Sequence, residues 1–286
     1  MLVVFGATER CGGAVAHAFL ERGVAVRALV RSPERAQDLR RRGAEICVGD
    51  LAREADVRTA LEGATTVFHA GPLPVDHPDP VAFELEAARR IVDAAKAVGV
   101  QHHIFLSSLG ADQHTGVPQI DSKARIEDWI KSAGLPYTFL RAGLLMDDFK
   151  SDLDAIRTGR LLGAARAEVA VSLVAAQDVA KAAWASFRAK KPGAAFELVG
   201  PRPVTFVEVA EAFGLALGRR VSYQSLAPQA WADPERLRVS PRYAELLVAL
   251  YECVNRGGFV GNPTALLRAL GVRPISIIDF ALGAVR

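Results

Sequence analysis

The stretch LVVFGATERCGGAVAHAFL, residues 2–20, decides the fold of this chain of 286 residues. Its apolar start, Leu2 to Phe5, is typical of a buried strand, and a helical pattern runs from Gly13 to Arg22. Between them, Gly6 is expected to make a tight turn and Gly12 to let the helix pack closely on the strand. A strand, a glycine-rich turn and a helix in this order predict a loop that binds the diphosphate of a dinucleotide at the helix N-terminus.

The loop departs from the expected pattern at its middle glycine, which is replaced by Glu9. A carboxylate there adds bulk and a charge of the same sign as phosphate, unless it turns away or meets a cation such as Arg10. Two interpretations stay open: Glu9 points to solvent and the cofactor binds, or binding is weakened or lost. The residues predicted to surround the diphosphate are Gly6, Thr8, Glu9, Arg10, Cys11 and Gly12.

The second strand, Val24 to Val30, ends at Arg31, about 20 residues past the loop, where NAD enzymes usually carry an acidic residue for the ribose 2′-hydroxyl. An arginine there suits a 2′-phosphate and favours NADP over NAD. The alternative is an ordinary exposed arginine. After the third strand, Asp50 and Leu51 are expected on the adenine side, although Asp50 can equally cap the next helix.

Outward from this unit, short β-branched or aromatic runs alternate with helical patterns as far as about residue 145. This rhythm predicts an α/β fold, a Rossmann doubly wound parallel sheet with a smaller mixed C-terminal lobe. We expect an NAD(P)-binding domain at 1–145, joined by a returning strand at 195–200. The lobe is expected at 146–194 and 201–286. The proline-rich segment from Gly71 to Pro80 is expected as a loop over the carboxyl ends of the strands.

Charge and composition exclude several classes of protein. The formal net charge is only +3, and the one basic cluster, Arg40 to Arg42, falls near the end of a predicted helix, so nucleic-acid binding is not expected. Nowhere do 18 apolar residues follow one another, and no basic segment precedes the first apolar strand. We therefore expect no membrane association. Three widely separated cysteines fit the reducing cytoplasm and give no metal-ligand spacing.

Five segments, taken in order, resemble the NmrA-like family of atypical short-chain dehydrogenases. They are GATERCGGAV at 6–15, VRALVRSPERA at 26–36, AAKAVGVQHHIFLSSLGAD at 94–112, SKARIEDWIKSAGLPYTFLRAGLLMDDF at 122–149 and FELVGPRPVTFVEVAEAFGLALGR at 196–219. The resemblance implies a Rossmann body and a smaller lobe with NAD(P) in the cleft between them. Some members of the family are NAD(P)H-dependent reductases, and others are catalytically silent redox sensors that regulate partner proteins.

The resemblance also implies catalytic positions, and one of them is changed. Short-chain dehydrogenases use a serine after the fifth strand and a Tyr-x-x-x-Lys pair on the next helix. Ser107, Ser108 and Lys123 match, but Gln119 stands at the tyrosine position and cannot act as an acid. Lys123 is therefore expected either to hydrogen-bond the nicotinamide ribose or to act as the general acid or base itself, if burial lowers its pKa.

Other reactive side chains near the expected cleft have plainer interpretations. Cys11, beside Arg10 at a helix N-terminus, is in a setting that stabilises a thiolate, but a small apolar residue closing the loop is the simpler interpretation. His69 and His114 near strand ends are expected at the polar rim, and His103 in the core of the fifth strand.

Three functions remain open from the sequence. The first is an NADPH-dependent reductase of a small apolar carbonyl, quinone or enone. The second is a non-catalytic NAD(P) redox sensor that binds a regulatory protein partner. The third is a Rossmann scaffold that has lost its cofactor through Glu9 and performs a non-redox step such as cyclisation or isomerisation. We expect a monomer or homodimer without a metal.

Overall fold

A computed structural model describes residues 1–189, 192–257 and 259–286. Its main sheet has seven parallel strands in the order β11-β6-β5-β4-β1-β2-β3. The strands are β1 Leu2–Phe5, β2 Val26–Val30, β3 Glu45–Val48, β4 Thr66–His69, β5 His102–Ser108, β6 Tyr137–Ala142 and β11 Ala194–Leu198. The predicted Rossmann fold is thereby confirmed.

The centre of the sheet follows from its apolar strands. Every residue of β1 is buried, and β1 pairs with β2 on one side and with β4 on the other, so that Val4 lies between Ala28 and Phe68. The strand order reverses between β1 and β4. In open α/β sheets, the crevice at the carboxyl ends of such a pair is where ligands bind.

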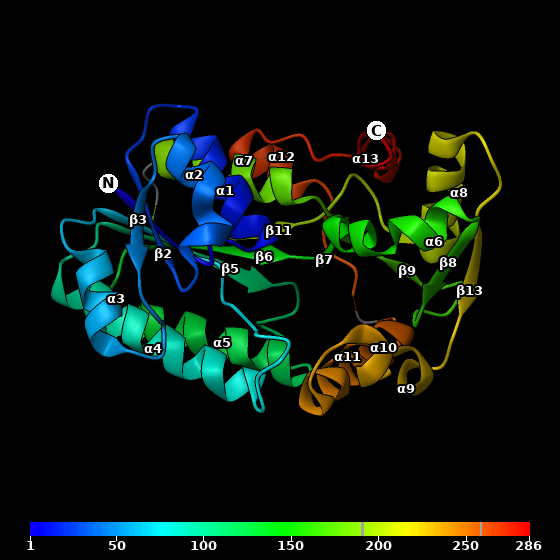
Figure 1. The fold of residues 1–286 in the computed structure, drawn as a ribbon, viewed down its shortest axis with the longest axis horizontal. Coiled ribbons are helices and arrows are strands. Elements are labelled where there is room, and N and C mark those ends of the chain that lie inside the picture. Colours follow the sequence, from blue (N-terminus) through cyan, green and yellow to red (C-terminus); the bar gives the residue numbers. More distant parts are fainter. Residues whose placement is uncertain (190–191, 258) are drawn as a thin grey trace.

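Helices cover both faces of the sheet, as parallel strands require. Figure 1 shows α1, α7 and α12 on one face and α3, α4 and α5 on the other. The helices are α1 Arg10–Leu20, α2 Gln37–Arg41 after a 3-10 turn Pro33–Ala36, α3 Glu54–Leu61, α4 Pro80–Ala97, α5 Pro118–Ser132, α7 Ala176–Ala189 and α12 Ala265–Leu270.

Helix α7 differs from the expected organisation, in which residues 146–194 lie in the smaller lobe. Its apolar face packs on α1 and on the sheet, where Val179 and Ala183 share a core with Val15 and Phe19. This helix leads directly into β11, which pairs with β6 at the edge of the sheet. Both elements therefore lie in the Rossmann layers.

The smaller lobe is built from short elements around an apolar core of its own, in which Phe149 contacts Phe206 and Phe213. Three two-stranded sheets and several helices form it. They are β7 Leu144–Leu145, a 3-10 segment Met146–Asp152, α6 Leu153–Arg157, β8 Arg160–Gly163, β9 Ala170–Val171, β10 Leu173–Val174, β12 Val204–Thr205, α8 Phe206–Leu217, β13 Ser222–Ser225, α9 Pro228–Trp231, α10 Pro234–Leu237, α11 Pro241–Asn255 and α13 Ile277–Ala284.

Two helices begin earlier than expected. Helix α1 begins at Arg10 rather than Gly13, and α5 begins at Pro118 rather than Ser122, because proline suits the first position of a helix. Gln119 and Lys123 consequently lie one turn apart on the same helix. In the described part of the chain, no helix has the length and apolarity needed to cross a membrane.

Candidate functional site

The loop between β1 and α1 needs glycine at two of its positions. Gly6 has a φ of 84°, and a Cβ added there would lie 2.8 Å from the Cβ of Ala70 on the neighbouring strand's loop. A Cβ on Gly12 would lie 2.1 Å from the carbonyl oxygen of Gly6. The helix can therefore approach the turn only because position 12 has no side chain, as the sequence predicted.

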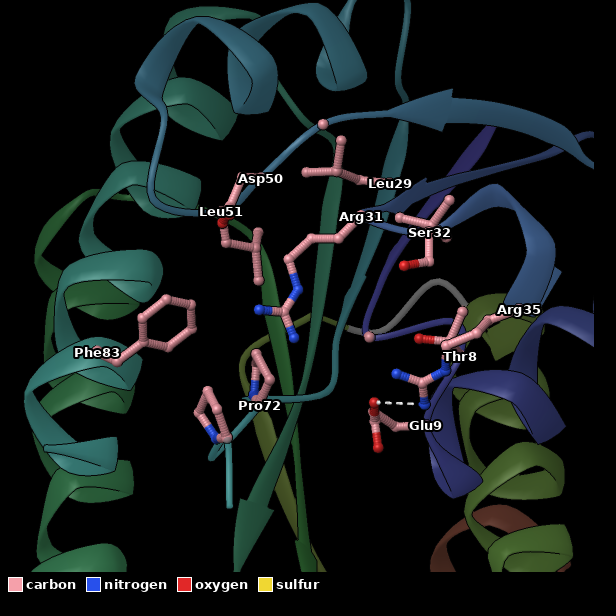
Figure 2. Close-up of a pocket in the computed structure, with 14 residues that line it drawn as sticks. Thr8, Glu9, Leu29, Arg31, Ser32, Arg35, Asp50, Leu51, Pro72 and Phe83 are labelled. Carbon is pink, nitrogen blue, oxygen red and sulfur yellow. Dashed lines mark ion pairs between the residues drawn. The ribbon is translucent and has the colours of Figure 1, made fainter. Parts of the chain in front are cut away.

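Position 9 is different, because its backbone is extended, with a φ of −93°, and accepts any residue. The Glu9 side chain is 56% exposed, and its Oε1 lies 3.6 Å from a guanidinium nitrogen of Arg35 (Figure 2). The cation that meets Glu9 is thus Arg35, and not Arg10. The Arg10 guanidinium instead pairs with Asp148 of the smaller lobe and donates a hydrogen bond to the Oγ of Ser151 at 2.7 Å.

A pocket opens beside this loop, and Figure 2 shows the Arg31 side chain reaching into it between Leu51 and the loop carrying Pro72. We call it the β1–β3 pocket, because it lies at the carboxyl ends of strands β1 to β3. Its lining residues come from five segments of the chain: Gly6, Thr8, Glu9, Leu29, Val30, Arg31, Ser32, Arg35, Gly49, Asp50, Leu51, Pro72, Pro74 and Phe83.

Six of the ten residues predicted to bind the cofactor line this pocket: Gly6, Thr8, Glu9, Arg31, Asp50 and Leu51. Arg10, Cys11 and Gly12 are not among the lining residues, and Lys123 lies in a second pocket. Asp50 does not cap the following helix, whose N-cap is Arg53, and its Oδ1 accepts a hydrogen bond from Ala52 N at 2.9 Å.

The residues of the β1–β3 pocket fit a dinucleotide cofactor. Arg31 is exposed and forms no ion pair with any residue that the structure describes. Ser32 and Arg35 lie on the same side of the pocket, while Leu51 and Phe83 offer apolar surface suited to an adenine. Glu9, at the rim, is partly neutralised by Arg35. The residues present therefore fit an NAD(P) cofactor.

A second, more apolar pocket lies between the sheet and α11, and we call it the α11 pocket. It brings together Ser107, Ser108 and Lys123, which the sequence proposed as catalytic residues. Its lining residues are Ala70, Leu73, Leu106, Ser107, Ser108, Gln119, Ile120, Lys123, Ala142, Gly143, Leu144, Leu145, Asp148, Tyr243, Leu246, Leu247, Leu250 and Phe259. The segment 70–74 lines both pockets, so they lie side by side.

Lys123 is held by a buried carboxylate that the sequence analysis missed. Its Nζ donates a hydrogen bond to Gly71 O at 3.0 Å and pairs with Oε1 of Glu84, which has no exposed surface. The second oxygen of Glu84 accepts a bond from Ser122 Oγ at 2.7 Å. Burial raises the pKa of Glu84, and the adjacent Lys123 opposes that rise. The helical spacing of Glu84 with the buried Ala87, Ala88 and Ile91 was the signal for its burial.

The two serines have different surroundings. Ser107 donates to Oε1 of Glu127 at 2.7 Å, and Glu127 also accepts bonds from Nε and a terminal nitrogen of Arg141, at 2.9 and 2.7 Å. The Ser107 hydroxyl therefore belongs to a buried network under the pocket. Ser108 is half-buried and donates only a long bond, 3.2 Å, to Leu109 O. Ser108 is the better placed of the two to meet a ligand.

Gln119, at the position of the missing tyrosine, connects the two parts of the protein. Its Nε2 donates a hydrogen bond to Leu246 O of α11 at 2.6 Å. Its Oε1 is buried and has no partner among the described residues. The side chain that replaces a proton donor thus ties α11 to α5.

Two of the plainer interpretations are decided by burial. Cys11 is buried, and burial raises the pKa of its thiol to about 12, so the thiolate hypothesis is wrong and the apolar interpretation holds. His69 does not lie at a rim, because it is fully buried, with its ring centroid 5.8 Å from that of His103. Burial lowers the pKa of both imidazoles, to about 3 in His103. Neither ring has a hydrogen-bond partner in the part of the chain that is described.

Comparisons with known proteins agree with this fold. The model of the NmrA-like family matches residues 1–263. An NAD(P)H azoreductase of Xenophilus azovorans is 30% identical over 236 residues, which are 79% of this chain and 77% of that protein. Quinone oxidoreductase 2 of Escherichia coli K12 is 26% identical and covers 95% of this chain and 94% of its own. The crystal structure of Citrobacter sp. triphenylmethane reductase with NADP(H) superimposes with a TM-score of 0.83 over 100% of both chains, at 23% identity.

Proposed function

The chain belongs to the NmrA-like family, and we propose that within it the protein is an NADPH-dependent reductase of a small, largely apolar acceptor. The acceptor would be a quinone, an enone, a carbonyl compound or an azo compound. The observation that carries the proposal is the adjacency of the two pockets. A cation-lined pocket suited to the phosphate end of NADPH and an apolar pocket next to it share the segment 70–74.

The choice of NADPH rests on the residues after β2. Arg31 has no counter-ion among the described residues, and Ser32 and Arg35 lie beside it. A guanidinium forms charge-assisted bonds to a phosphate, whereas it gains little from a bare ribose hydroxyl. The bound cofactor would supply a hydride. Lys123 and Ser108 would orient the nicotinamide end, because both line the α11 pocket.

The choice of acceptor rests on the walls of the α11 pocket. Seven of its eighteen lining residues are leucines, contributed by the strand ends, the 70–74 segment and α11, and Phe259 adds an aromatic ring. Such walls favour a flat apolar molecule, which gains affinity by leaving water. Gln119 cannot donate a proton as an acid, which favours acceptors such as quinones that need little acid catalysis. The names of the azoreductase and the quinone oxidoreductase support acceptors of this kind.

The test is a titration of the purified protein with NADPH and with NADH, followed by assays of nicotinamide oxidation with a panel of quinones, enones and azo dyes. We expect NADPH to bind more tightly than NADH and to be oxidised by at least one acceptor class. Tight NADPH binding without turnover on the whole panel would favour the redox sensor instead. If neither nucleotide binds, the scaffold that has discarded its cofactor becomes the better hypothesis.

A further inference from the structure

Helix α11 of the smaller lobe forms one wall of the α11 pocket and is fixed there at two points. Ser240 N, at the start of the helix, donates a hydrogen bond to Val75 O in the proline-rich loop at 2.7 Å. Nearly two turns further on, Leu246 O accepts the 2.6 Å bond from Gln119. Figure 1 shows α11 beside the end of α5. Helix α11 is therefore positioned by the proline-rich loop and by α5, and both of these segments also line the pocket.

These two points fix the position of Tyr243, which lies between them. Ser240 caps the helix, since its Oγ accepts a bond from Tyr243 N at 3.1 Å, and Pro241 sets the first turn. Tyr243 and Leu246 are three residues apart on one face of α11, and both line the pocket. The backbone of Tyr243 is thus held at the α11 wall of the pocket that Lys123 and Ser108 also line.

The Tyr243 hydroxyl is free for a ligand. The side chain is half-buried, and no hydrogen bond joins its hydroxyl to any atom of residues 1–189, 192–257 or 259–286. In the same region a phenol is absent from α5, where Gln119 occupies the tyrosine position. We propose that Tyr243 is the catalytic proton donor of this protein, delivered to the acceptor from the lobe side by α11.

This inference rests on the proposed reductase function and names the source of the proton that the reduction consumes. The bound cofactor would supply a hydride to the acceptor, and the Tyr243 O–H bond would break as its proton passes to the acceptor oxygen or nitrogen. The phenolate then takes a proton from water in the open pocket. A tyrosine is ordinarily protonated at neutral pH, and burial, together with the nearby Asp148, raises the pKa of Tyr243 further, so its proton is in place at the start of each cycle.

Lys123 is less suited to give up a proton. Two of its three N–H groups are committed, to Gly71 O and to the buried carboxylate of Glu84. If Lys123 lost a proton, Glu84 would be left as an unpaired buried charge, which is strongly unfavourable. Lys123 is therefore assigned to orientation and Tyr243 to proton transfer.

The first test measures binding without cofactor or turnover. It compares 2,3-dimethyl-1,4-naphthoquinone with tetramethylnaphthalene, which has the same shape but no oxygen, by equilibrium dialysis against the wild type, Tyr243→Phe and Tyr251→Phe. Loss of one hydrogen bond should weaken quinone binding to Tyr243→Phe by roughly 2- to 10-fold and leave the hydrocarbon unchanged. Tyr251 is the matched control, since it lies on α11 and packs on Trp231 at 4.9 Å outside the pocket lining. Equal losses for both compounds would overturn a hydrogen-bonding role.

The second test measures turnover with acceptors that differ in how much they need a proton donor. Tyr243→Phe should lower kcat by about 100-fold or more for carbonyl or azo acceptors, with little change in NADPH affinity, and much less for quinones of high potential. Tyr251→Phe should match the wild type. If Tyr243→Phe turns over azo and carbonyl acceptors like the wild type, the inference fails and the reductase function stands. If the wild type reduces no acceptor, both fail together.

Discussion

The Glu9 carboxylate lies 3.6 Å from the Arg35 guanidinium at the rim of the β1–β3 pocket. Both side chains are more than half exposed, so the pair contributes little to folding stability. Its effect is on ligands instead. The carboxylate partly neutralises Arg35, which faces the expected phosphate site. It also repels an incoming anion.

Replacing Glu9 with Gln should therefore tighten NADPH binding. The change removes the negative charge but keeps the shape of the side chain and the extended backbone. We expect the Kd to fall by about 5- to 10-fold at low salt, and the gain to shrink as salt screens the charge. Calorimetric titration at two ionic strengths measures both effects. Glu34→Gln, an exposed neighbour outside the pocket lining, is the control. An unchanged Kd would show that Glu9 is neutral toward the cofactor.

Arg31 should determine the preference for NADPH over NADH. It reaches into the pocket and has no counter-ion among the described residues, so a 2′-phosphate would be its partner. Arg31→Ala should weaken NADPH binding by about 10- to 100-fold, the range of a charge-assisted hydrogen bond, with NADH affinity nearly constant. Arg40→Ala, an exposed arginine at the end of α2, should change neither affinity. Equal losses for both nucleotides would place Arg31 away from the 2′ position.

Much of this arrangement could be predicted from local sequence. The apolar strand, the glycine turn and the helix near the N-terminus specify their own structure, and strand ends in a parallel sheet necessarily meet at one edge. For this reason Gly6, Arg31 and Asp50, which follow different strands, were correctly expected near one another. The two serines and Lys123 were likewise placed together by the family pattern.

The residues that could not be predicted act across long separations. Glu84 meets Lys123 from a position 39 residues away, and this pairing depends on how α4 packs against α5. Arg35 reaches Glu9 only because the turn after β2 folds over the loop. Tyr243 comes from a lobe whose pattern gave no hint of which side chains face the pocket. Side-chain roles of this kind are set by tertiary packing rather than by local periodicity.

The buried His103 should make stability fall in mild acid. Its pKa is lowered to about 3 by burial, so the folded state holds it neutral, whereas the unfolded chain binds a proton near pH 6.5. Between these values the unfolded state carries the extra proton, and the free energy of unfolding falls by up to about 1.4 kcal/mol per pH unit for each such histidine. Above pH 7 the penalty vanishes.

His103→Leu tests this assignment. The variant should be at least as stable as the wild type at pH 7.5, because it removes two buried ring nitrogens that lack partners among the described residues. Between pH 6.5 and 5 its urea midpoint should fall less steeply, with the remaining slope due in part to His69. His114→Asn, an exposed position, should retain the wild-type slope. A variant slope equal to that of the wild type would assign the acid sensitivity to other groups.

The buried pair of Lys123 and Glu84 allows stability and function to be separated. Lys123→Met alone leaves the fully buried Glu84 carboxylate without its cation, and Glu84→Leu alone leaves the ammonium without its anion. Each single change should cost about 3–5 kcal/mol of unfolding free energy, measured by urea denaturation. The double variant replaces both charges with apolar groups of similar volume and should recover much of that loss. Because Lys123 also lines the α11 pocket, we expect the double variant to stay defective in acceptor reduction even though its stability is restored. If activity returned along with stability, Lys123 would have only a structural role, and the orientation of the nicotinamide end would have to depend on Ser108 and its neighbours.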